Sequence, residues 1–486
     1  MTKESNRNES RVFFSRKTLI QLAIGFAILV VISIIPIPSA IGGGGLTPEG
    51  QRAIAVLVMA GYLWIGNVLP VGATAFLLLS LLPLMGLVTA KDSMAQLAND
   101  TNFLVMGGFV VAGSMSIYGL DKRIAISVIK RIGTSIPKVF LGVMVSCAFL
   151  SMWMSNTVAM LCVLPIVLGI FRVMNIKPGD SLAKMFYMGL LMSAVLGGMS
   201  TIVGTPPNVY CVSTLAEAGI EVSFLSWMVV GTPISWGSML LSWFFMYKFV
   251  FKLSMKKDPA LTQYVNDEYA KLGKMGKGEL ISAISLVVFI IMLMFKDFFA
   301  GIFGADFYTN GIAALVPAVF LFIAGAVNWK EAVDSISWQT MLFFSSGLVL
   351  SNAIKGTGAA AWMANGISSF CPAALIPLMF MLMAVVLTQF SSNTAVAAVF
   401  LPVALATATA AGANPTITCV CLALASSLGF LTPIGTPIGV ILLGKQVDGN
   451  SYIDEPVEYF KYNFIPFMVC FVFVIAYCSL LVPVLI

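Results

Sequence analysis

Apolar residues run in long blocks along nearly the whole chain, and many blocks have about the twenty residues needed to cross a hydrocarbon core. Of the 486 residues, 59% are hydrophobic and only 10% are charged, and a soluble domain cannot hide so much apolar surface. We therefore predict an all-α polytopic membrane protein. The apolar stretches are residues 18–38, 52–68, 71–88, 102–119, 139–174, 184–203, 223–250, 279–299, 311–327, 338–354, 372–411, 416–434 and 463–485.

Charged residues gather in a few segments, and their sign predicts the orientation in the membrane. Residues 1–17 are polar and basic, which is typical of a cytoplasmic tail. Basic clusters also mark residues 122–138 and the connection 251–278, which we expect on the cytoplasmic side as well. A nucleic-acid patch would need aromatic or base-reading partners on a soluble face, and none is visible, so no nucleic-acid partner is expected. The predicted location is the cell (cytoplasmic) membrane, with the lipid bilayer as a partner and the N-terminus inside.

Two of the apolar stretches are about twice as long as one crossing needs. Residues 139–174 are interrupted near the centre by Ser155-Asn156-Thr157, and residues 372–411 by Ser392-Asn393-Thr394. Each half-stretch is short of a full span, so we predict two re-entrant helical hairpins. The charges around them predict that the first enters from the cytoplasm and the second from outside. The two halves, residues 18–250 and 279–486, would then form an inverted repeat.

A duplicated set of motifs supports this arrangement. The pattern [S/T]-x-x-x-S-N-T-x6-L-P begins at Ser151 and again at Thr388. A second pattern, G-x-x-T-x-x-G-T-P, begins at Gly198 and again at Gly429. Two different patterns that recur in the same order at nearly the same spacing indicate an internal duplication.

The second pattern predicts unwound breaks in two further membrane helices, at residues 204–208 and 435–439. Inside a bilayer, unwound backbone is tolerated only where it lines a polar cavity or a binding site. We expect Pro206 and Pro437 in first helical turns, and we expect all four helix starts to present unpaired N–H groups and positive dipole ends to one centre. Such a centre attracts an anion, while the carbonyl and hydroxyl oxygens of the breaks suit a small cation such as Na⁺.

Missing residue types exclude several functions. The chain has no histidine, and every acidic residue lies in a predicted tail, connection or segment end. An enzyme is therefore not expected, and neither is proton loading on a membrane-embedded side chain. No cofactor is expected beyond Na⁺ as the coupling ion. Lys355 and Lys445, the cations near the apolar interior of the second half, are expected to snorkel at helix ends.

At these motifs the chain resembles the divalent anion/sodium symporter family, which includes bacterial dicarboxylate transporters. The resemblance implies about eleven transmembrane helices plus the two hairpins, divided into a scaffold and a transport domain that moves like an elevator, in a homodimer. It also implies Na⁺-coupled secondary transport of C4 or C5 dicarboxylates of the succinate, malate, fumarate and 2-oxoglutarate class.

The resemblance also implies binding roles at the matching positions of this chain. The first Na⁺ site would use Ser151, Ser155, Asn156 and Gly204, and the second Thr388, Ser391, Asn393 and Gly435. The first unwound segment keeps the sequence Thr-Pro-Pro-Asn, whereas the second reads Thr-Pro-Ile-Gly, a departure that bears on the second ion site. The implied substrate-binding residues are Ser155, Asn156, Thr157, Thr205, Ser392, Asn393, Thr394, Thr436 and Pro437.

Other modes of action share these residues. The family includes Na⁺-independent dicarboxylate exchangers, and nothing in the sequence separates exchange from symport. A requirement for external Na⁺ would separate them. A channel would need a continuous pore in place of an occluded site, and stimulation of uptake by substrate on the far side would argue against it.

Overall fold

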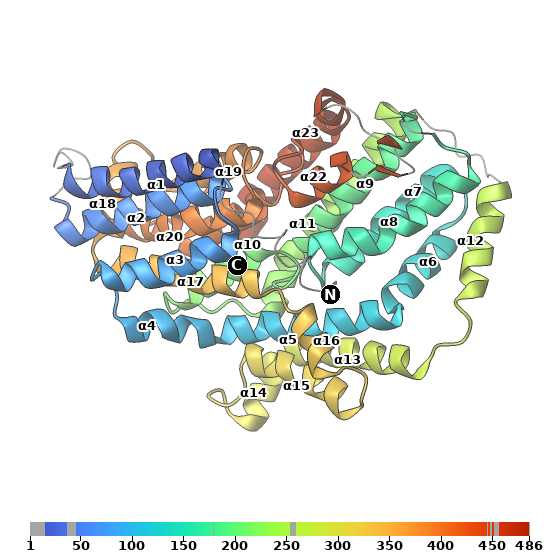
Figure 1. Ribbon diagram of the computed structural model, residues 1–486, viewed down its shortest axis with the longest axis horizontal. Helices are drawn as coiled ribbons and strands as arrows, with labels where there is room; N and C mark the ends of the chain where they lie inside the picture. The colour runs from blue at the N-terminus through green and yellow to red at the C-terminus, as the bar shows by residue number, and fades with distance from the viewer. Residues whose placement is uncertain are drawn as a thin grey trace, which may run out of the picture.

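The computed structural model describes residues 15–35, 45–177, 179–252, 259–444, 446–447, 450–451 and 456–485, and it is built almost entirely of helices (Figure 1). The first half contains α1 (Arg16–Ile34), α2 (Pro48–Ile65), α3 (Val71–Leu84), α4 (Ala90–Ala95), the 3₁₀ turn η2 (Gln96–Ala98), α5 (Asp100–Tyr118), α6 (Leu120–Ile132), α7 (Ile136–Ser151), α8 (Asn156–Val173), α9 (Ser181–Gly198), α10 (Pro206–Ala216), α11 (Phe224–Phe245) and the π turn η3 (Met246–Val250).

The rest of the chain follows the same plan of long helices joined by short ones. It contains α12 (Pro259–Lys271), α13 (Lys277–Met294), α14 (Lys296–Phe303), α15 (Asn310–Ile323), α16 (Trp329–Ser335), α17 (Trp338–Gly356), α18 (Ala359–Ser368), the 3₁₀ turn η4 (Ala373–Leu375), α19 (Ile376–Leu387), α20 (Asn393–Ala411), α21 (Pro415–Ser426), α22 (Pro437–Gly444), the strands β1 (Gln446–Val447) and β2 (Asn450–Ser451), α23 (Pro456–Leu480) and α24 (Val482–Leu485). The two short strands pair antiparallel.

By length and composition, eight helical segments of the described chain can cross a bilayer. They are Arg16–Ile34, Ala90–Tyr118, Asn156–Val173, Ser181–Gly198, Phe224–Val250, Lys277–Met294, Asn393–Ala411 and Val457–Leu485. Five shorter apolar helices accompany them, among them the first arms of both predicted hairpins, Ile136–Ser151 and Ala373–Leu387. The all-α membrane fold predicted from the sequence is therefore confirmed.

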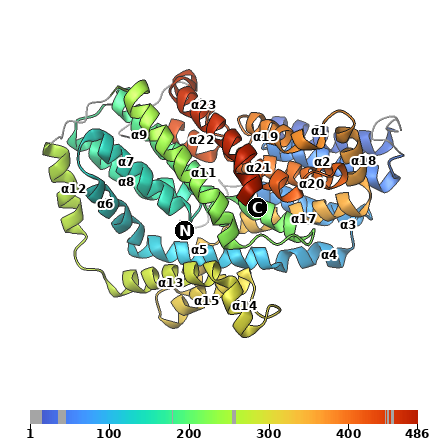
Figure 2. The same cartoon turned by 180° about the vertical axis from the view of Figure 1, so that it is seen from behind.

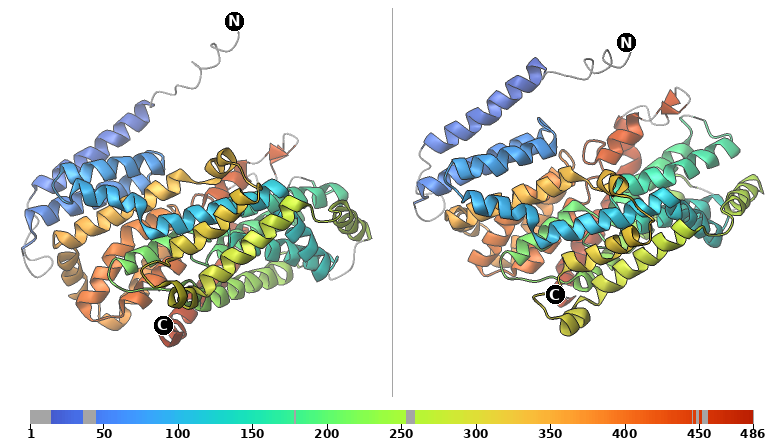
Figure 3. Two further views of the ribbon diagram at one scale, coloured as in Figure 1. Left: turned by 90° about the horizontal axis from the view of Figure 1, so that it is seen from below. Right: turned by 60° about the horizontal axis from the view of Figure 1, so that its bottom comes forward.

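The helices gather around a centre where the broken helices meet. Figure 1 shows α1, α2, α3, α17 and α18 on one side and α6, α7, α8 and α12 on the other. Seen from behind, α11 and α23 run along one face, where they pack against each other (Figure 2). The two views of Figure 3 show α5 and α13 side by side across the molecule, and α15 packs on both. The centre is thus enclosed by helices from both halves of the chain.

Each predicted hairpin is a pair of helices interrupted at its polar triplet. Helix α7 ends at Ser151 and α8 begins at Asn156, while α19 ends at Leu387 and α20 begins at Asn393. The break forms there because the Ser155 hydroxyl caps α8 by accepting the N–H of Val158 at 3.4 Å. Ser392 caps α20 in the same way, since its hydroxyl accepts the N–H of Ala395 at 3.2 Å.

The two halves interlock at the second pair of breaks. Helix α10, which follows the first break, packs against α20 and α21 of the second half, and α22 packs against α8 and α9 of the first half. The helix that follows each of these breaks, α10 or α22, therefore packs against the hairpin of the other half. This exchange brings all four breaks to the centre of the molecule.

The unwound segments lie earlier in the chain than residues 204–208 and 435–439. Helix α9 ends at Gly198 and α10 already begins at Pro206, while α21 ends at Ser426 and α22 begins at Pro437. Proline fits the first helical position because it has a suitable fixed φ and the N–H it lacks would have no intrahelical partner. The predicted first-turn prolines are confirmed, and the unwound residues are 199–205 and 427–436.

The structure adds detail to the predicted connection and tail and corrects the expectation for Lys355. The connection 251–278 contains α12, which packs on α6 and α8, and α1 begins at Arg16 within the predicted tail, whose residues 1–14 lie outside the described chain. Lys355 does not snorkel to solvent: its Nζ is buried without a hydrogen-bond partner among the described residues, within electrostatic reach of Glu217 at the end of α10. Lys445 lies outside the described residues.

Candidate functional site

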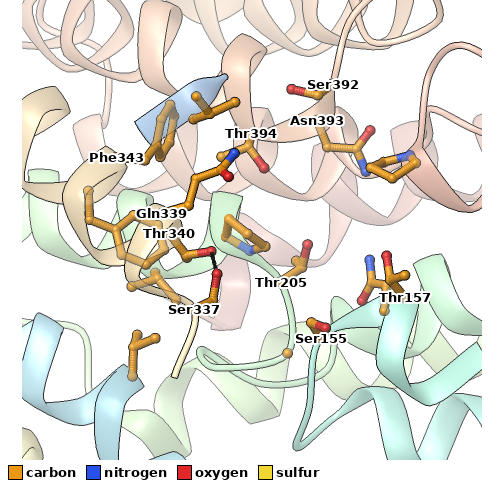
Figure 4. Close-up of a pocket in the computed structure, with 18 of the residues that line it drawn as sticks. Ser155, Thr157, Thr205, Ser337, Gln339, Thr340, Phe343, Ser392, Asn393 and Thr394 are labelled. Atoms are coloured by element: carbon orange, nitrogen blue, oxygen red, sulfur yellow. Dashed lines mark hydrogen bonds between the residues drawn. The ribbon is translucent and has the colours of Figure 1, made fainter. Parts of the chain in front are cut away.

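The four breaks open onto one central cavity of about 330 Å³ (Figure 4). This volume lies within the range of small-molecule sites in proteins. All nine residues predicted to bind substrate line the cavity: Ser155, Asn156, Thr157, Thr205, Ser392, Asn393, Thr394, Thr436 and Pro437. None of the described residues that line it is charged. The structure thus brings together polar residues from opposite halves of the chain.

The two hairpin tips supply hydrogen-bond donors to this cavity. Asn156 and Thr157 are the first residues of α8, and the first N–H groups of a helix have no acceptor within the helix. Asn393 and Thr394 hold the same positions in α20. The tips therefore present backbone N–H groups, the positive ends of two helix dipoles and the Thr hydroxyls, and this combination suits an anion.

The starts of α10 and α22 contribute less than the sequence predicted. Pro206 and Pro207 have no N–H to offer, so the expectation of unpaired N–H groups at all four helix starts is wrong for α10. At α22 the N–H of Ile438 is donated to the Thr436 hydroxyl at 3.0 Å, and the N–H of Gly439 to the Thr436 carbonyl. These two helices contribute their dipoles, while free backbone donors come from the hairpin tips.

Asn156 lies in a cluster of oxygen atoms behind the first tip. Turned so that its nitrogen faces the cluster, the amide donates to Ser151 Oγ at 2.8 Å, Gly204 O at 3.1 Å and Ala194 O at 3.2 Å. In the other orientation, the Asn156 amide oxygen faces the same three oxygens. Only one of these three oxygens, the Ser151 hydroxyl, has a proton to donate, and this hydroxyl already donates to Ala194 O. Several uncharged oxygens around one point are the ligand set that a hard cation such as Na⁺ takes.

Asn393 has the same surroundings behind the second tip. Its amide nitrogen, when turned inward, donates to Thr388 Oγ1 at 2.7 Å, Ser426 O at 3.1 Å and Gly435 O at 3.2 Å. Thr388 Oγ1 also lies 2.7 Å from Ser426 O, as Ser151 Oγ lies beside Ala194 O in the first half. Ser391, two residues before Asn393, is buried, and its hydroxyl has no hydrogen-bond partner among the described residues. Of the predicted ion ligands, Ser151, Thr388, Ser391 and Gly435 do not line the cavity.

The duplication therefore extends to individual contacts. Thr201 donates its hydroxyl to the carbonyl of Met152, and Thr432 donates its hydroxyl to the carbonyl of Gln389, which matches Met152 in the duplicated pattern. These bonds tie each unwound segment to the turn of the hairpin in the same half. Each oxygen cluster takes one partner from its unwound segment and one from the end of its first hairpin arm, so both clusters depend on these ties.

Glycine is required at the point where the hairpin turn meets the unwound segment. A Cβ atom at Gly204 would lie 2.8 Å from Ser151 O and 2.5 Å from Gly198 O. A Cβ atom at Gly435 would lie 2.6 Å from Thr388 O and closer still to Gly429 O. Only a residue without a side chain lets these backbones approach closely enough for their carbonyls to converge.

The sequence departure between the halves has a structural counterpart. Asn208 of the Thr-Pro-Pro-Asn segment donates its amide to Thr201 O at 2.7 Å and Gly198 O at 3.0 Å, which holds the first break. Gly439 replaces it in the second half, where a Cβ would lie 2.6 Å from Pro433 O. There the amide of Gln389 donates to Leu428 O at 2.9 Å instead. The second break is therefore held by a residue of the hairpin turn.

Sequence reasoning missed the wall of the cavity that faces the hairpin tips. This wall comes from α3, α5 and the start of α17, and its residues are Val71, Val105, Phe109, Ser337, Gln339, Thr340, Phe343 and Phe344. Its aromatic and aliphatic side chains are typical of any membrane helix. The available signal was the group of polar residues at 337–340, just before a long apolar run.

A helical membrane protein whose broken helices from two repeats meet at a central, uncharged cavity has the plan of many secondary transporters. A family model supports this class: the chain belongs to the family described as the sodium:sulfate symporter transmembrane region, whose model matches residues 16–483. The family consists of transporters, so this chain is a transporter and not an enzyme. The family predicted from the motifs is confirmed.

Two relatives are similar to this chain in sequence over most of their length. The sodium-dependent dicarboxylate transporter SdcS of Staphylococcus saprophyticus is 29% identical over 474 residues, which are 91% of this chain and 90% of the relative. SdcS of Staphylococcus aureus strain USA300 is 27% identical over 421 residues, 82% of this chain and 80% of the relative.

Two solved transporter structures share the fold at low sequence identity. MtrF of Neisseria gonorrhoeae, from a class of antimetabolite efflux pumps, matches with a TM-score of 0.58 at 13% identity over 96% of this chain and 95% of that chain. The YdaH transporter of Alcanivorax borkumensis matches with a TM-score of 0.58 at 11% identity over 97% of this chain and 99% of that chain.

Proposed function

We propose that this protein is a secondary active transporter of C4 and C5 dicarboxylates that is driven by Na⁺. The observation that carries the proposal is the pair of equivalent oxygen clusters around Asn156 and Asn393, directly behind the two hairpin tips. Its relatives in two Staphylococcus species are named sodium-dependent dicarboxylate transporters, which supports the same substrate class and ion. The predicted Na⁺ and substrate residues keep their roles in this proposal.

Charge balance explains why such a cavity needs the ion. A dicarboxylate enters with two negative charges, and none of the described lining residues carries a positive one. Helix ends supply only partial charges, so they offset a dianion incompletely. A Na⁺ ion in each cluster supplies a full positive charge on the far side of each tip. Substrate binding then depends on prior ion binding, and this dependence couples their transport.

The duplicated tips also suit a substrate with two similar ends. Each tip offers the same Ser-Asn-Thr donors, one carboxylate can bind at each tip, and both ends of a succinate-like molecule are then held alike. A sulfate ion has no second end to reach the other tip. The cavity therefore favours dicarboxylates within a family whose model is named for sulfate.

The proposal includes an elevator motion, a homodimer and a cytoplasmic N-terminus. The four breaks belong to α7–α10 and α19–α22, which bind each other across the centre, whereas α3, α5 and α17 provide only the opposite wall. A unit that carries both tips and both ion clusters can slide past a wall that holds none of the ion ligands. The basic clusters of the sequence support a cytoplasmic N-terminus.

Uptake by purified protein in proteoliposomes tests the coupling. Labelled succinate and 2-oxoglutarate are offered outside with either Na⁺ or K⁺, to empty vesicles and to vesicles preloaded with dicarboxylate. We expect saturable uptake of unchanged substrate into empty vesicles only with a Na⁺ gradient. Uptake that requires preloading and is indifferent to Na⁺ would overturn the symport proposal in favour of exchange on the same fold.

Variants at the oxygen clusters test the ion sites. Asn156→Ala and Asn393→Ala each remove the amide at the centre of a cluster and very little packing, so we expect loss of Na⁺-dependent uptake in protein that still purifies folded. Asn266→Ala is the matched control, because Asn266 is exposed on α12, outside the cavity. Normal uptake by either cluster variant would show that the Na⁺ ligands lie elsewhere.

A further inference from the structure

The wall of the cavity opposite the tips carries three polar side chains, and two of them already bind each other. Ser337 and Thr340 share a hydrogen bond of 2.7 Å between their hydroxyls. The third, Gln339, has no hydrogen-bond partner among the described residues, and its side chain is exposed toward the cavity that it lines. Figure 4 shows its amide extending from α17 toward the side of the cavity where Thr394 of the second tip lies.

The stem of Gln339 is held in place by a neighbouring helix. A Cβ atom at Gly72 of α3 would lie 3.3 Å from Gln339 Cγ and 3.5 Å from its Cα. The glycine therefore lets the glutamine stem pack directly on α3, and this packing directs the amide away from α3 and into the cavity. A side chain positioned in this way loses little freedom when it binds a ligand.

The position of Gln339 determines which part of a substrate it can reach. In the proposed function the two tips hold the two carboxylates, and both tips belong to the repeat elements on one side of the cavity. The start of α17 closes the other side, so Gln339 faces the carbon chain between the carboxylates. Its neighbours on this wall, Val105, Phe109 and Phe343, are apolar and suit methylene groups.

We infer that Gln339 recognises a hydroxyl or oxo group at C2 of the dicarboxylate, so that the transporter favours malate-like and 2-oxoglutarate-like substrates over succinate. This inference rests on the proposed function. An amide suits the task because its NH₂ donates to an oxo or hydroxyl oxygen and its carbonyl accepts from a hydroxyl. An unsubstituted chain that fills the cavity displaces water from the amide and leaves it unpaired. A site built to hydrogen-bond a substituent discriminates strongly against the analogue that lacks it.

Competition between substrates in the same vesicles tests the inference. Wild type and Gln339→Met, which keeps the length of the side chain and removes its polar atoms, are reconstituted and given malate and succinate with different labels. The ratio of their uptake reports the ratio of kcat/KM and does not depend on how much protein is active. We expect the variant to lose roughly tenfold in the malate-to-succinate ratio, which is the worth of one good hydrogen bond. The same loss is expected for 2-oxoglutarate against succinate.

The control is Gln263→Met, since Gln263 is exposed on α12 and does not line the cavity, and its ratio should equal that of the wild type. A ratio within about twofold of wild type in Gln339→Met, or an equal loss of all substrates at an unchanged ratio, would overturn the inference while leaving dicarboxylate transport intact. Failure of the wild type itself to transport any dicarboxylate would refute the proposed function, and it is seen before any variant is tested.

Discussion

Substitution of Gly435 by alanine gives the sharpest test of how the second oxygen cluster is built. The new Cβ would lie 2.6 Å from Thr388 O, whereas Cβ atoms in proteins essentially never come closer than 3.0 Å to another heavy atom. One of the two backbones must therefore move by at least 0.4 Å, the difference between these distances. Both belong to the cluster, because Gly435 O and Thr388 Oγ1 are partners of the Asn393 amide.

A displacement of that size exceeds what a bound ion tolerates. Metal-to-ligand distances are usable only within about 0.2 Å of their ideal values, so at least one of the proposed Na⁺ ligands is lost. Overpacking of this kind costs about 1 to 3 kcal/mol, and every 1.4 kcal/mol is tenfold in an equilibrium constant. If the ion-binding equilibrium bears this cost, the Na⁺ concentration for half-maximal uptake rises roughly 5- to 150-fold.

The assay is initial uptake of labelled dicarboxylate as a function of external Na⁺, together with the shift of thermal unfolding that Na⁺ produces in detergent. Gly61→Ala is the control, because a Cβ there would lie at an ordinary 3.5 Å from Val399. An unchanged Na⁺ dependence in Gly435→Ala, with normal uptake, would refute the reasoning that the oxygens around Asn393 form an ion site.

Three further outcomes follow from contacts away from the tips. Asn208→Ala removes the amide that holds the first break, and we expect about 1 to 3 kcal/mol lower stability in urea or thermal unfolding, because buried carbonyls lose their donor. Lys355→Met leaves the partly buried Glu217 without its neighbouring cation, so the melting temperature should fall. The double variant Lys355→Met/Glu217→Gln should recover most of the lost melting temperature. A double variant that melts no higher than Lys355→Met would contradict a charge interaction between the two residues. A hydrogen bond from Lys271 holds the pKa of Glu268, on α12, below its usual 4.5, so Glu268→Gln should cost at most about 1 kcal/mol at pH 7. The stabilisation is complete above the unfolded-state pKa and is lost as the pH falls through the lower folded-state pKa, so this difference in melting temperature should shrink as the pH falls below about 4.5.

The sequence located most of the candidate site because its physical demands are local. Polar Ser-Asn-Thr triplets in the middle of apolar stretches cannot continue a membrane helix without lining a cavity, so the triplets alone predicted the tips at Asn156 and Asn393. The second duplicated pattern, at Gly198 and Gly429, predicted the breaks before α10 and α22. The boundaries of those breaks were misplaced by a few residues, because the start of a helix at Pro206 is fixed by capping and the preceding end by packing.

Other features could not be predicted because they depend on distant segments. The partners of Asn156 come from α7, α9 and the unwound segment, and only folding shows that their oxygens meet at about 3 Å. Gln339 stands in a helix with no motif, and its importance arises from Gly72, which lies in the other half of the chain. Lys355 was expected to snorkel at a helix end, yet the packing of α10 against α17 encloses its Nζ near Glu217.

By itself, the sequence determined that this chain lies in a membrane, that it is built from two related halves, and that each half carries a broken helix and a broken hairpin. These properties follow from hydrophobicity and from the requirement that backbone polar groups be satisfied, which act over a few residues at a time. The tertiary structure decided which oxygens converge, which glycines must remain bare and which wall faces the substrate. Those properties are distances between segments far apart in the chain, and they exist only once the two halves have packed into each other.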